Sequence, residues 1–334
     1  MIPETKKPAI NHALQVTFGT TDLEETRELT AGLSSALVFR IIVRGKPYLL
    51  RIITRTDAMA DPTLEYNCMK AAAEAGIAPK VWYANVEDRI AIIDFIDAKP
   101  FPMEEAKTKL PYLLKRLHAL PPFPFRINYL DKIAEFIEKF RAGNLIPDEL
   151  TAGLFNFYTR VKNIYPRNAE DLVGCHNDLK PENTLFDGER VWLVDWEAAF
   201  LNDRYLDLAI MANFLVKNEE DKKIYLEAYF GQEAAEYQHA RFFLMRQILH
   251  LFYFVVFTMA GKTPNKPVDS NMAMPGFREF HDLIWTGKLS LANMDNRLQY
   301  AQIHREQLQH NLGLKRLDEA LLIVANYQSL SRNR

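Results

Sequence analysis

One short segment limits what this chain can fold into more than any other part of it. Residues 175–197 read CHNDLKPENTLFDGERVWLVDWE. Their middle predicts a β-hairpin, because two short apolar runs flank the turn dipeptide Asp187-Gly188. A hairpin of this length folds Asp195 back toward Asn183. The segment therefore predicts that several polar side chains meet at one end of a small sheet.

The polar side chains of this segment indicate phosphoryl transfer. Asn183 and Asp195 offer the hard oxygen ligands that Mg²⁺ prefers, and Asp178 can accept a hydrogen bond from a substrate hydroxyl. We interpret His176 as a residue that fixes the loop by hydrogen bonding. Lys180 is a candidate contact to the transferring phosphoryl group, and its alternative is a solvated lysine. For the whole motif, the alternative is a polar loop with an Asx turn.

The segment resembles the motifs of the aminoglycoside phosphotransferase and choline/ethanolamine kinase superfamily, in particular those of bacterial choline-kinase-like proteins. Residues 175–178 (CHND) and 194–197 (VDWE) are similar to the motifs of choline kinases. The LHAL sequence at 117–120 and the ND-x₃-DLA pattern at 202–209 are also similar to superfamily motifs. The resemblance covers about residues 20–260. It implies a two-lobed protein-kinase-like fold of the α+β class, with ATP and Mg²⁺ as cofactors.

The pattern of predicted elements gives a small β-rich N-lobe at 1–97 and a large, mostly helical C-lobe at 98–334. We expect a five-stranded antiparallel sheet and one helix in the N-lobe, and a catalytic hairpin at 174–195 in the C-lobe. The expected strands are 26–30, 36–43, 47–53, 81–84 and 90–95, and the N-lobe helix is 62–75. The expected C-lobe helices are 104–120, 130–142, 148–165, 203–217, 219–230, 233–260, 276–285, 294–310 and 316–329.

A loop between the first two predicted strands is the candidate nucleotide-covering loop. It spans residues 30–35 and contains Gly32, Ser34 and Ser35. Backbone N–H groups and serine hydroxyls there could contact phosphates. The alternative is an ordinary hairpin turn, because only one glycine is present.

Other candidate nucleotide contacts lie on the third strand, the following helix and the lobe boundary. Arg51 stands where protein kinases carry lysine, and the resemblance implies that arginine takes this place. Its guanidinium could contact the α- and β-phosphates and pair with Glu65 or with Glu74. The resemblance also implies that backbone groups at the end of the fifth strand, from Asp94 to Ile96, bond the adenine.

The acceptor is the least constrained part of the prediction. Glu197 adds an acidic group beside Asp195, and we expect Tyr205, Tyr253 and Trp285 to form aromatic walls that suit a quaternary ammonium. Core packing is the alternative role of these rings. We therefore expect a small cationic alcohol of the choline or ethanolamine type. An aminoglycoside or thiamine is the alternative, since Ala198 stands where choline-kinase relatives often have tyrosine.

Composition excludes some functions. The net charge of −2 offers no basic excess for nucleic acid or an anionic membrane. The apolar run Phe242–Ala260 contains Arg246, Gln247 and His250, so we expect a buried core helix and no membrane insertion. Two cysteines and no apolar N-terminal signal indicate a cytoplasmic protein, which we expect to be a monomer or a homodimer.

Two other classes of protein remain as alternatives to a small-molecule kinase. A catalytically weak pseudokinase would bind nucleotide without transfer, but this chain keeps the full acidic set of the motif. A protein kinase would carry Asp-Phe-Gly in place of the Asp-Trp-Glu at 195–197, followed by Ala-Pro-Glu. The sequence lacks both features, so we expect a phosphotransferase with an alcohol group as acceptor.

Overall fold

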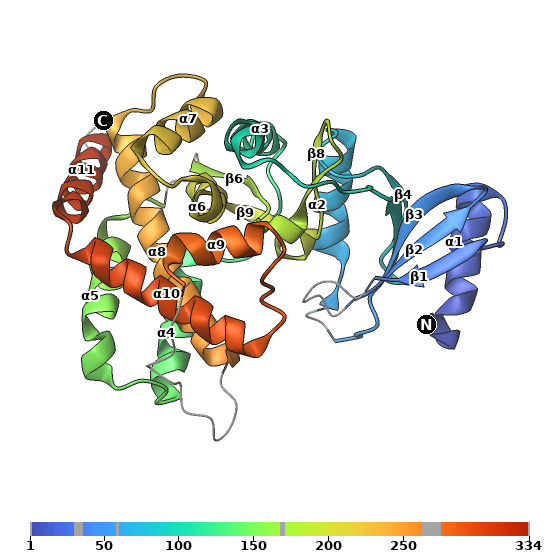
Figure 1. Ribbon diagram of the computed structural model, residues 1–334, viewed down its shortest axis with the longest axis horizontal. Coiled ribbons are helices and arrows are strands. Elements are labelled where there is room, and N and C mark those ends of the chain that lie inside the picture. Colours follow the sequence, from blue (N-terminus) through green and yellow to red (C-terminus); the bar gives the residue numbers. More distant parts are fainter. Residues whose placement is uncertain (1, 30–35, 58–59, 168–170, 262–274, 333–334) are drawn as a thin grey trace.

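The computed structural model describes residues 2–29, 36–57, 60–167, 171–261 and 275–332. A lobe built on one sheet and a larger, mostly helical lobe lie side by side (Figure 1). The predicted two-lobed α+β fold is thereby confirmed. The candidate nucleotide loop with Gly32, Ser34 and Ser35 lies outside the described residues.

The N-lobe sheet has five antiparallel strands, as predicted, in the order β1-β2-β3-β5-β4. The strands are β1 Glu25–Glu28, β2 Leu37–Val43, β3 Lys46–Ile52, β4 Val81–Asn85 and β5 Ile90–Asp94. β-Branched and leucine side chains make up most of β2, β3 and β5, which form the centre of the sheet. Arg44 and Gly45 both have positive φ in the tight turn between β2 and β3.

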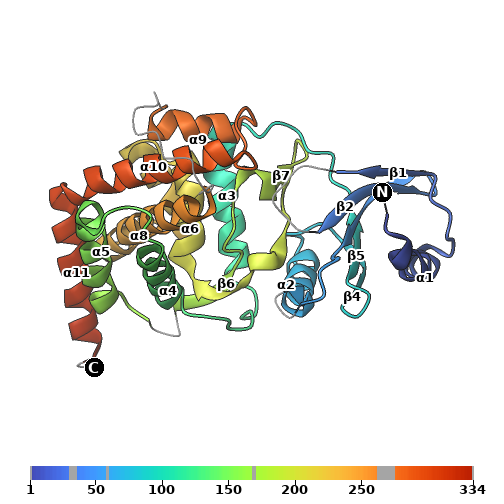
Figure 2. The ribbon, with the colours of Figure 1, turned by 90° about the horizontal axis from the view of Figure 1, so that it is seen from below.

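Helices cover both faces of this sheet, which lies between α1 and α2 in Figure 2. Helix α2, Thr63–Glu74, was predicted, and Asp61 accepts the backbone N–H of Thr63 at 2.8 Å where the helix begins. Helix α1, Lys7–Phe18, was not predicted. It buries Ile10 and Leu14 in a cluster with residues of β2, β3 and β5. The two faces therefore belong to different hydrophobic clusters, since α2 packs with residues of the C-lobe.

The C-lobe is built from helices around one large hydrophobic cluster. Its helices are α3 Met103–Leu117, α4 Tyr129–Ala142, α5 Asp148–Ile164, α6 Arg204–Leu215, α7 Glu219–Phe230, α8 Glu236–Gly261, α9 Phe277–Trp285, α10 Met294–Leu312 and α11 Lys315–Arg332. All were predicted to within a few residues at each end. Their apolar positions recur at helical spacing, which is why the sequence shows them clearly.

Helix α8 is the core of this lobe. Among the described residues it alone is long and apolar enough to cross a membrane, a test that the core helix of a soluble protein also passes. Most of its apolar window is buried, and it packs against α6, α10 and α11. The prediction of a buried core helix is confirmed.

Two small sheets hold the segment that carries the motif. The predicted hairpin is present as β7 Thr184–Phe186 and β8 Val191–Leu193. The strands β6 Leu172–Cys175 and β9 Phe200–Asp203 form a second antiparallel pair that was not predicted. Because β6 precedes the catalytic loop and β9 follows Asp195, this pair brings the two ends of the motif together.

Candidate active site

The proposed catalytic loop is the segment 176–180. Its backbone is held by hydrogen bonds to the side chain of Asp207, which lies on α6. The two carboxylate oxygens of Asp207 accept the backbone N–H groups of His176 and Asn177, each at 2.8 Å. One of these oxygens also lies 3.1 Å from His118 Nε2. Asp207 is fully buried, so these hydrogen bonds compensate for the loss of its hydration. The contribution of His118 was not predicted.

Two side chains of the loop tie it to the segment around Asp195. His176 Nε2 lies 2.9 Å from the carbonyl oxygen of Val194, which is the loop-fixing bond that the sequence led us to expect. Asn177 has a φ of 65°, and its amide donates to the Ala198 carbonyl at 2.9 Å. Its amide oxygen accepts a hydrogen bond from Asn202 at 2.8 Å. The loop and the strand that follows the motif are therefore cross-linked by side chains.

Asp178, Lys180 and Asn183 contact one another. Lys180 Nζ lies 2.8 Å from Asp178 Oδ2. The Asn183 amide donates to the backbone oxygen of Asp178 at 2.8 Å and to its Oδ2 at 3.1 Å. Among the described residues, Asp178 Oδ1 accepts no hydrogen bond, and neither does Asn183 Oδ1. Both oxygens are thus left for a substrate or a metal.

The two ends of the hairpin bring the two expected metal ligands, Asn183 and Asp195, close to each other. The N–H of Val194 donates to the backbone oxygen of Asn183 at 3.0 Å, so the next residue, Asp195, stands beside Asn183. Asp195 has a φ of 65°, which is uncommon for a residue with a side chain. Its Oδ1 meets Arg51, whereas its Oδ2 has no hydrogen-bond partner among the described residues. One carboxamide oxygen and one carboxylate oxygen fit the ligand preference of Mg²⁺.

A second group of possible metal-ligating side chains surrounds Asp207, which binds the backbone of the loop. His118, Cys175 and Asp207 place one ligand atom each within 4.8 Å of one another. All three are buried, and both oxygens of Asp207 already accept backbone N–H groups. Burial also raises the pKa of the Cys175 thiol well above its usual value, which disfavours the thiolate. This group is therefore part of the packing under the loop.

Arg51 of β3 is surrounded by three carboxylates. It lies 3.1 Å from Glu65, 3.0 Å from Asp195 and 3.3 Å from Glu197. Of the two glutamates left open by the sequence, Glu65 is thus the one that contacts Arg51. Burial raises the pKa of Glu65 to about 7, against the opposing effect of Arg51. The cluster keeps an excess of acidic groups, which favours a bound cation.

A cavity of about 750 Å³ opens beside this cluster, between α2 and the segment after α3. Arg51, Glu65 and Glu197 form part of its wall, and Arg55, Phe125 and Arg126 form another part. A volume of this size accommodates a ligand much larger than a metal ion. The acidic cluster is thus accessible from outside.

The expected adenine contacts lie in the segment between the lobes. Asp94 ends β5, and its Oδ1 accepts the indole N–H of Trp82 at 2.6 Å. The backbone of Ile96 makes no backbone hydrogen bond to the described residues. Three residues later, the N–H of Lys99 donates to the carbonyl of Phe186 on β7 at 2.6 Å. The connecting segment is therefore anchored to the hairpin, while Ile96 keeps its backbone groups available.

The predicted aromatic wall is only partly assembled. The ring of Tyr253 packs near those of Phe257 and Tyr300, with centroids 5.8 and 5.4 Å away. The pKa of Tyr253 is raised, chiefly by burial and further by the charge of Asp178, so this group lies within electrostatic range of the catalytic loop. Tyr300 was missed, although it shares one face of α10 with His304 one turn later.

The other two predicted rings lie elsewhere. Trp285 donates from its indole N–H to the carbonyl of Phe101 at 3.1 Å and packs against that ring. Tyr205 is buried against Arg241, whose guanidinium lies 4.6 Å from the ring centroid. The expectation that Tyr205 contributes to an acceptor wall is therefore corrected, because its ring is occupied by a structural arginine.

Comparisons with known proteins bear on the family and the fold of the chain. The family model described as the phosphotransferase enzyme family (APH) matches residues 25–243, which is more than half of the chain. The chain is 35% identical over 85 residues to Protein LicA of Haemophilus influenzae, a match that covers 25% of this chain and 23% of that protein. The curated relatives it matches are covered over about a quarter to a third of their length.

Two solved structures show the same fold. A choline/ethanolamine kinase family protein from Mesorhizobium loti superposes with a TM-score of 0.69 at 20% identity, and the match covers 96% of this chain and 99% of that one. Choline kinase LicA from Streptococcus pneumoniae superposes with a TM-score of 0.58 at 14% identity, covering 91% and 100%. The predicted resemblance is confirmed, and so is the small-molecule kinase class at the level of its family. The chain belongs to the phosphotransferase enzyme family.

Proposed function

We propose that this phosphotransferase moves the γ-phosphate of ATP, with Mg²⁺, to the hydroxyl of a small cationic alcohol of the choline or ethanolamine type. One observation carries the proposal. The unbonded Oδ1 of Asp178 lies in the same hairpin-held segment as the unbonded Asn183 Oδ1 and Asp195 Oδ2. This arrangement supports the proposal that Asp178 is the base and that Asn183 and Asp195 are the metal ligands.

Each residue then has a simple task. Asp178 accepts the hydrogen bond of the acceptor hydroxyl and orients it for attack. Asn183 and Asp195 would hold Mg²⁺, which supplies neutralisation of phosphate charge when bound. Arg51 and Lys180 place fixed positive charge beside the phosphates. No covalent nucleophile of the protein is needed, since positioning and electrostatics provide the rate enhancement.

The nucleotide would lie between the lobes. The backbone groups of Ile96, two residues after Asp94, make no backbone hydrogen bond to the described residues and suit the adenine edge. Gly32, Ser34 and Ser35 remain the proposed contacts to the phosphates. His176 acts by holding the loop through its bond to Val194.

Charge and ring chemistry favour a cationic acceptor. Glu197 adds a carboxylate beside Asp195, and burial, followed by the charge of Asp195, raises its pKa. Tyr253 and Tyr300 offer aromatic faces within electrostatic range of Asp178. Trp285 packs against Phe101 and is not part of the proposed acceptor wall. The names of the similar proteins, which include choline and ethanolamine kinases, support the same class.

A coupled ADP-release assay with a panel of alcohols tests the proposal. Choline and ethanolamine should raise ADP release above the rate without acceptor, whereas thiamine or an aminoglycoside as the best acceptor would replace the proposed substrate. No stimulation by any alcohol would indicate a pseudokinase, and transfer to a protein substrate alone would indicate a protein kinase.

Two substitutions test the roles within the site. Asp178→Asn should abolish transfer but leave ATP affinity nearly unchanged, because the base does not contact the nucleotide. Asp195→Asn should weaken binding of ATP in the presence of Mg²⁺, which calorimetry measures directly. Equal turnover of Asp178→Asn and the parent protein would refute the base assignment.

We also propose that the protein works in the cytoplasm, as a monomer or a homodimer. Its two cysteines are buried and unpaired, which suits a reducing compartment.

A further inference from the structure

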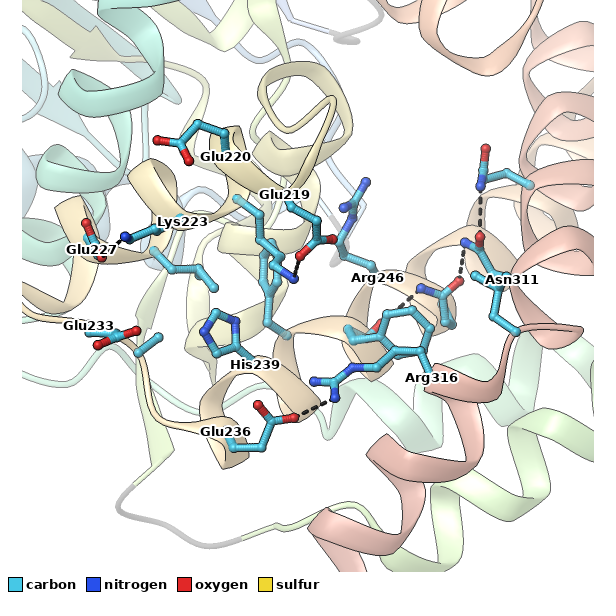
Figure 3. Close-up of a pocket in the computed structure, with 18 of the residues that line it drawn as sticks. Glu219, Glu220, Lys223, Glu227, Glu233, Glu236, His239, Arg246, Asn311 and Arg316 are labelled. Atoms are coloured by element: carbon cyan, nitrogen blue, oxygen red, sulfur yellow. Dashed lines mark hydrogen bonds and ion pairs between the residues drawn. The ribbon is translucent and has the colours of Figure 1, made fainter.

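The C-lobe contains a second large cavity, of about 800 Å³, which no step of the proposed reaction uses. It is bounded by α7, α8, α10 and the first residues of α9 and α11. Helices α7, α8 and α11 gather at the end of the C-lobe opposite the N-lobe (Figure 1). The residues around it include charged groups of both signs, and several point toward one another in Figure 3.

Most charged groups at the rim are already compensated. Arg316 pairs with Glu236 at 2.5 Å, Lys222 pairs with Glu219, and Lys223 lies 3.9 Å from Glu227. The remaining glutamates of the lining, at positions 220 and 233, are exposed to solvent. The acidic side chains of the cavity are therefore paired or hydrated, and none needs a bound cation.

Two arginines of the lining lack such partners. Among the described residues, neither Arg246 nor Arg278 has a carboxylate within ion-pair distance. Arg278 donates one hydrogen bond to the carbonyl of Val216. Arg246 lies on α8, is only partly accessible, and has an enclosed Nε without a hydrogen-bond partner.

The surroundings of Arg246 disfavour its charge. Burial, followed by the charge of Arg278, lowers the pKa of Arg246 to about 10, and Tyr225 and Glu219 oppose these effects. Burial likewise lowers the pKa of Arg278, and Asp221 and Asp282 oppose that effect. Both guanidinium groups still carry their charge at neutral pH. Arg246 is only partly accessible and keeps its charge near the like charge of the exposed Arg278, which costs free energy that a bound anion would recover.

Most of the rest of the lining is apolar or hydrogen-bonded, apart from His239, whose buried Nδ1 has no hydrogen-bond partner among the described residues. Phe242, Phe243 and Phe277 contribute aromatic surface. The side-chain oxygen of Gln247 accepts a hydrogen bond from the Asn311 amide at 2.7 Å, and the Gln247 amide donates a hydrogen bond to the carbonyl oxygen of Phe243. These amides therefore form a wall and leave Arg246, together with the exposed Arg278, as charged groups of the lining without an ion-pair partner among the described residues. The volume far exceeds that of an inorganic ion, so the shape suits an anionic head attached to an apolar body.

We propose that this cavity binds a small organic anion, with a phosphate or carboxylate head between Arg246 and Arg278 and an apolar body against Phe242, Phe243 and Phe277. The site is separate from the active site, since the two share no lining residue. The planar guanidinium of Arg246 contacts two oxygens of the head, which is the geometry that arginine favours.

Titration calorimetry with phenyl phosphate, benzoate and phenol tests the proposal, with sodium chloride holding the ionic strength constant. Phenyl phosphate or benzoate should bind and raise the thermal unfolding midpoint in a saturable way, and phenol should bind at least tenfold more weakly. Preference for phenyl phosphate assigns a phosphate head, and preference for benzoate assigns a carboxylate head. Failure of both anions to bind overturns the proposal.

Substitutions of the two arginines test whether the anion binds in this cavity. Arg246→Gln should weaken anion affinity by at least about tenfold, which corresponds to about 1.4 kcal/mol, and Arg278→Gln should weaken it several-fold. Lys288→Gln removes an exposed charge just after α9 and serves as the matched control, with unchanged affinity. Without added anion, Arg246→Gln should be at least as stable as the parent protein.

The active site must be excluded as the source of binding, because it also is expected to accept phosphates. Arg51→Gln should keep the response to the anion that binds the parent protein. Loss of the response in Arg51→Gln, or an unchanged affinity in both Arg246→Gln and Arg278→Gln, would show that the cavity does not bind the anion. If Arg246→Gln does not fold, the exposed Arg278→Gln variant carries the same test.

Discussion

His118 Nε2 lies 3.1 Å from Asp207 Oδ2 beneath the catalytic loop, where both side chains are almost completely removed from solvent. The same carboxylate accepts the N–H groups of His176 and Asn177, and the other nitrogen of His118 lies 2.8 Å from the Tyr229 hydroxyl. A helix of the core thus sets the backbone from which Asp178 projects.

Removal of the Asp207 carboxylate should therefore damage stability and catalysis together. Asp207→Ala leaves two buried N–H groups and an imidazole without their acceptor, which should cost about 3 kcal/mol or more in free energy of unfolding. Urea denaturation and ADP release measure the two effects. Asp318→Ala, which breaks only the exposed pair with Arg160, is the control and should change neither. A stable and fully active Asp207→Ala protein would contradict the role given to this residue.

The pair between Arg51 and Glu65 should control nucleotide affinity. Glu65→Gln removes one of three carboxylates around Arg51, so the guanidinium should shift toward Asp195 and Glu197 and meet the phosphates less well. We expect the KM for ATP to rise several-fold, with a smaller change in the KM for the alcohol. Glu74→Gln lies on the same helix, is exposed and should leave both values unchanged. Equal effects of the two variants would refute the assignment to Glu65.

Stability should fall in mildly acidic solution because three buried histidines must stay neutral. Burial lowers the pKa of His250 and His304 well below the usual value. Burial, with the charges of Arg278 and Arg246, lowers the pKa of His281 to about 3, and the same two charges contribute to the shift of His250. Since the pKa values in the folded state are lowered, the stabilisation is complete above about pH 6.5 and is lost as the pH falls toward the folded-state values.

Each such histidine contributes up to about 1.4 kcal/mol per pH unit below 6.5. The free energy of unfolding, measured in urea at pH 7.5, 6 and 5, should therefore decline more steeply than one histidine explains. His281→Phe should reduce the slope, since its ring lies among Phe214, Phe277 and Tyr300. A pH-independent stability between 7.5 and 5 would contradict the prediction.

Arg241 should be essential for folding of the C-lobe. Its guanidinium is buried and lies 2.6 Å from Asp171 and 2.5 Å from Asp203, which begins α6. Arg241→Met leaves both carboxylates without a counter-ion, so we expect a loss of about 3–5 kcal/mol in the free energy of unfolding. Arg160→Met removes an arginine from an exposed pair and should have little effect. Chemical denaturation of the two variants makes the comparison.

Much of the fold could be predicted from local patterns. The strands β2, β3 and β5 carry continuous apolar runs, and the C-lobe helices show helical periodicity over many residues. Helix α1 was missed because few of its residues are buried, although Pro8 near its start and Gly19 in left-handed conformation at its end are typical helix boundaries. The pair β6 and β9 was missed because two four-residue strands far apart in the sequence leave no local signal.

Some residues of the site could likewise be predicted from local sequence, and others depend on packing. Asp178, Asn183 and Asp195 were recognisable because one hairpin holds them together, so their proximity followed from local structure. The choice between Glu65 and Glu74 depended on which side of α2 faces β3, and that is a matter of packing. Tyr205 was misplaced for a related reason, since the sequence does not show that Arg241 occupies its ring.

The two faces of the N-lobe sheet differ in how far their packing depends on the C-lobe. The face under α1 is complete within the N-lobe, whereas Tyr66 and Met69 of α2 belong to the hydrophobic cluster of the C-lobe. The small lobe is therefore not an exchangeable module. A chimera that takes residues 1–97 from a relative would need the C-lobe residues beneath α2 from the same relative, and the boundary in sequence is not the boundary at which this protein can be recombined.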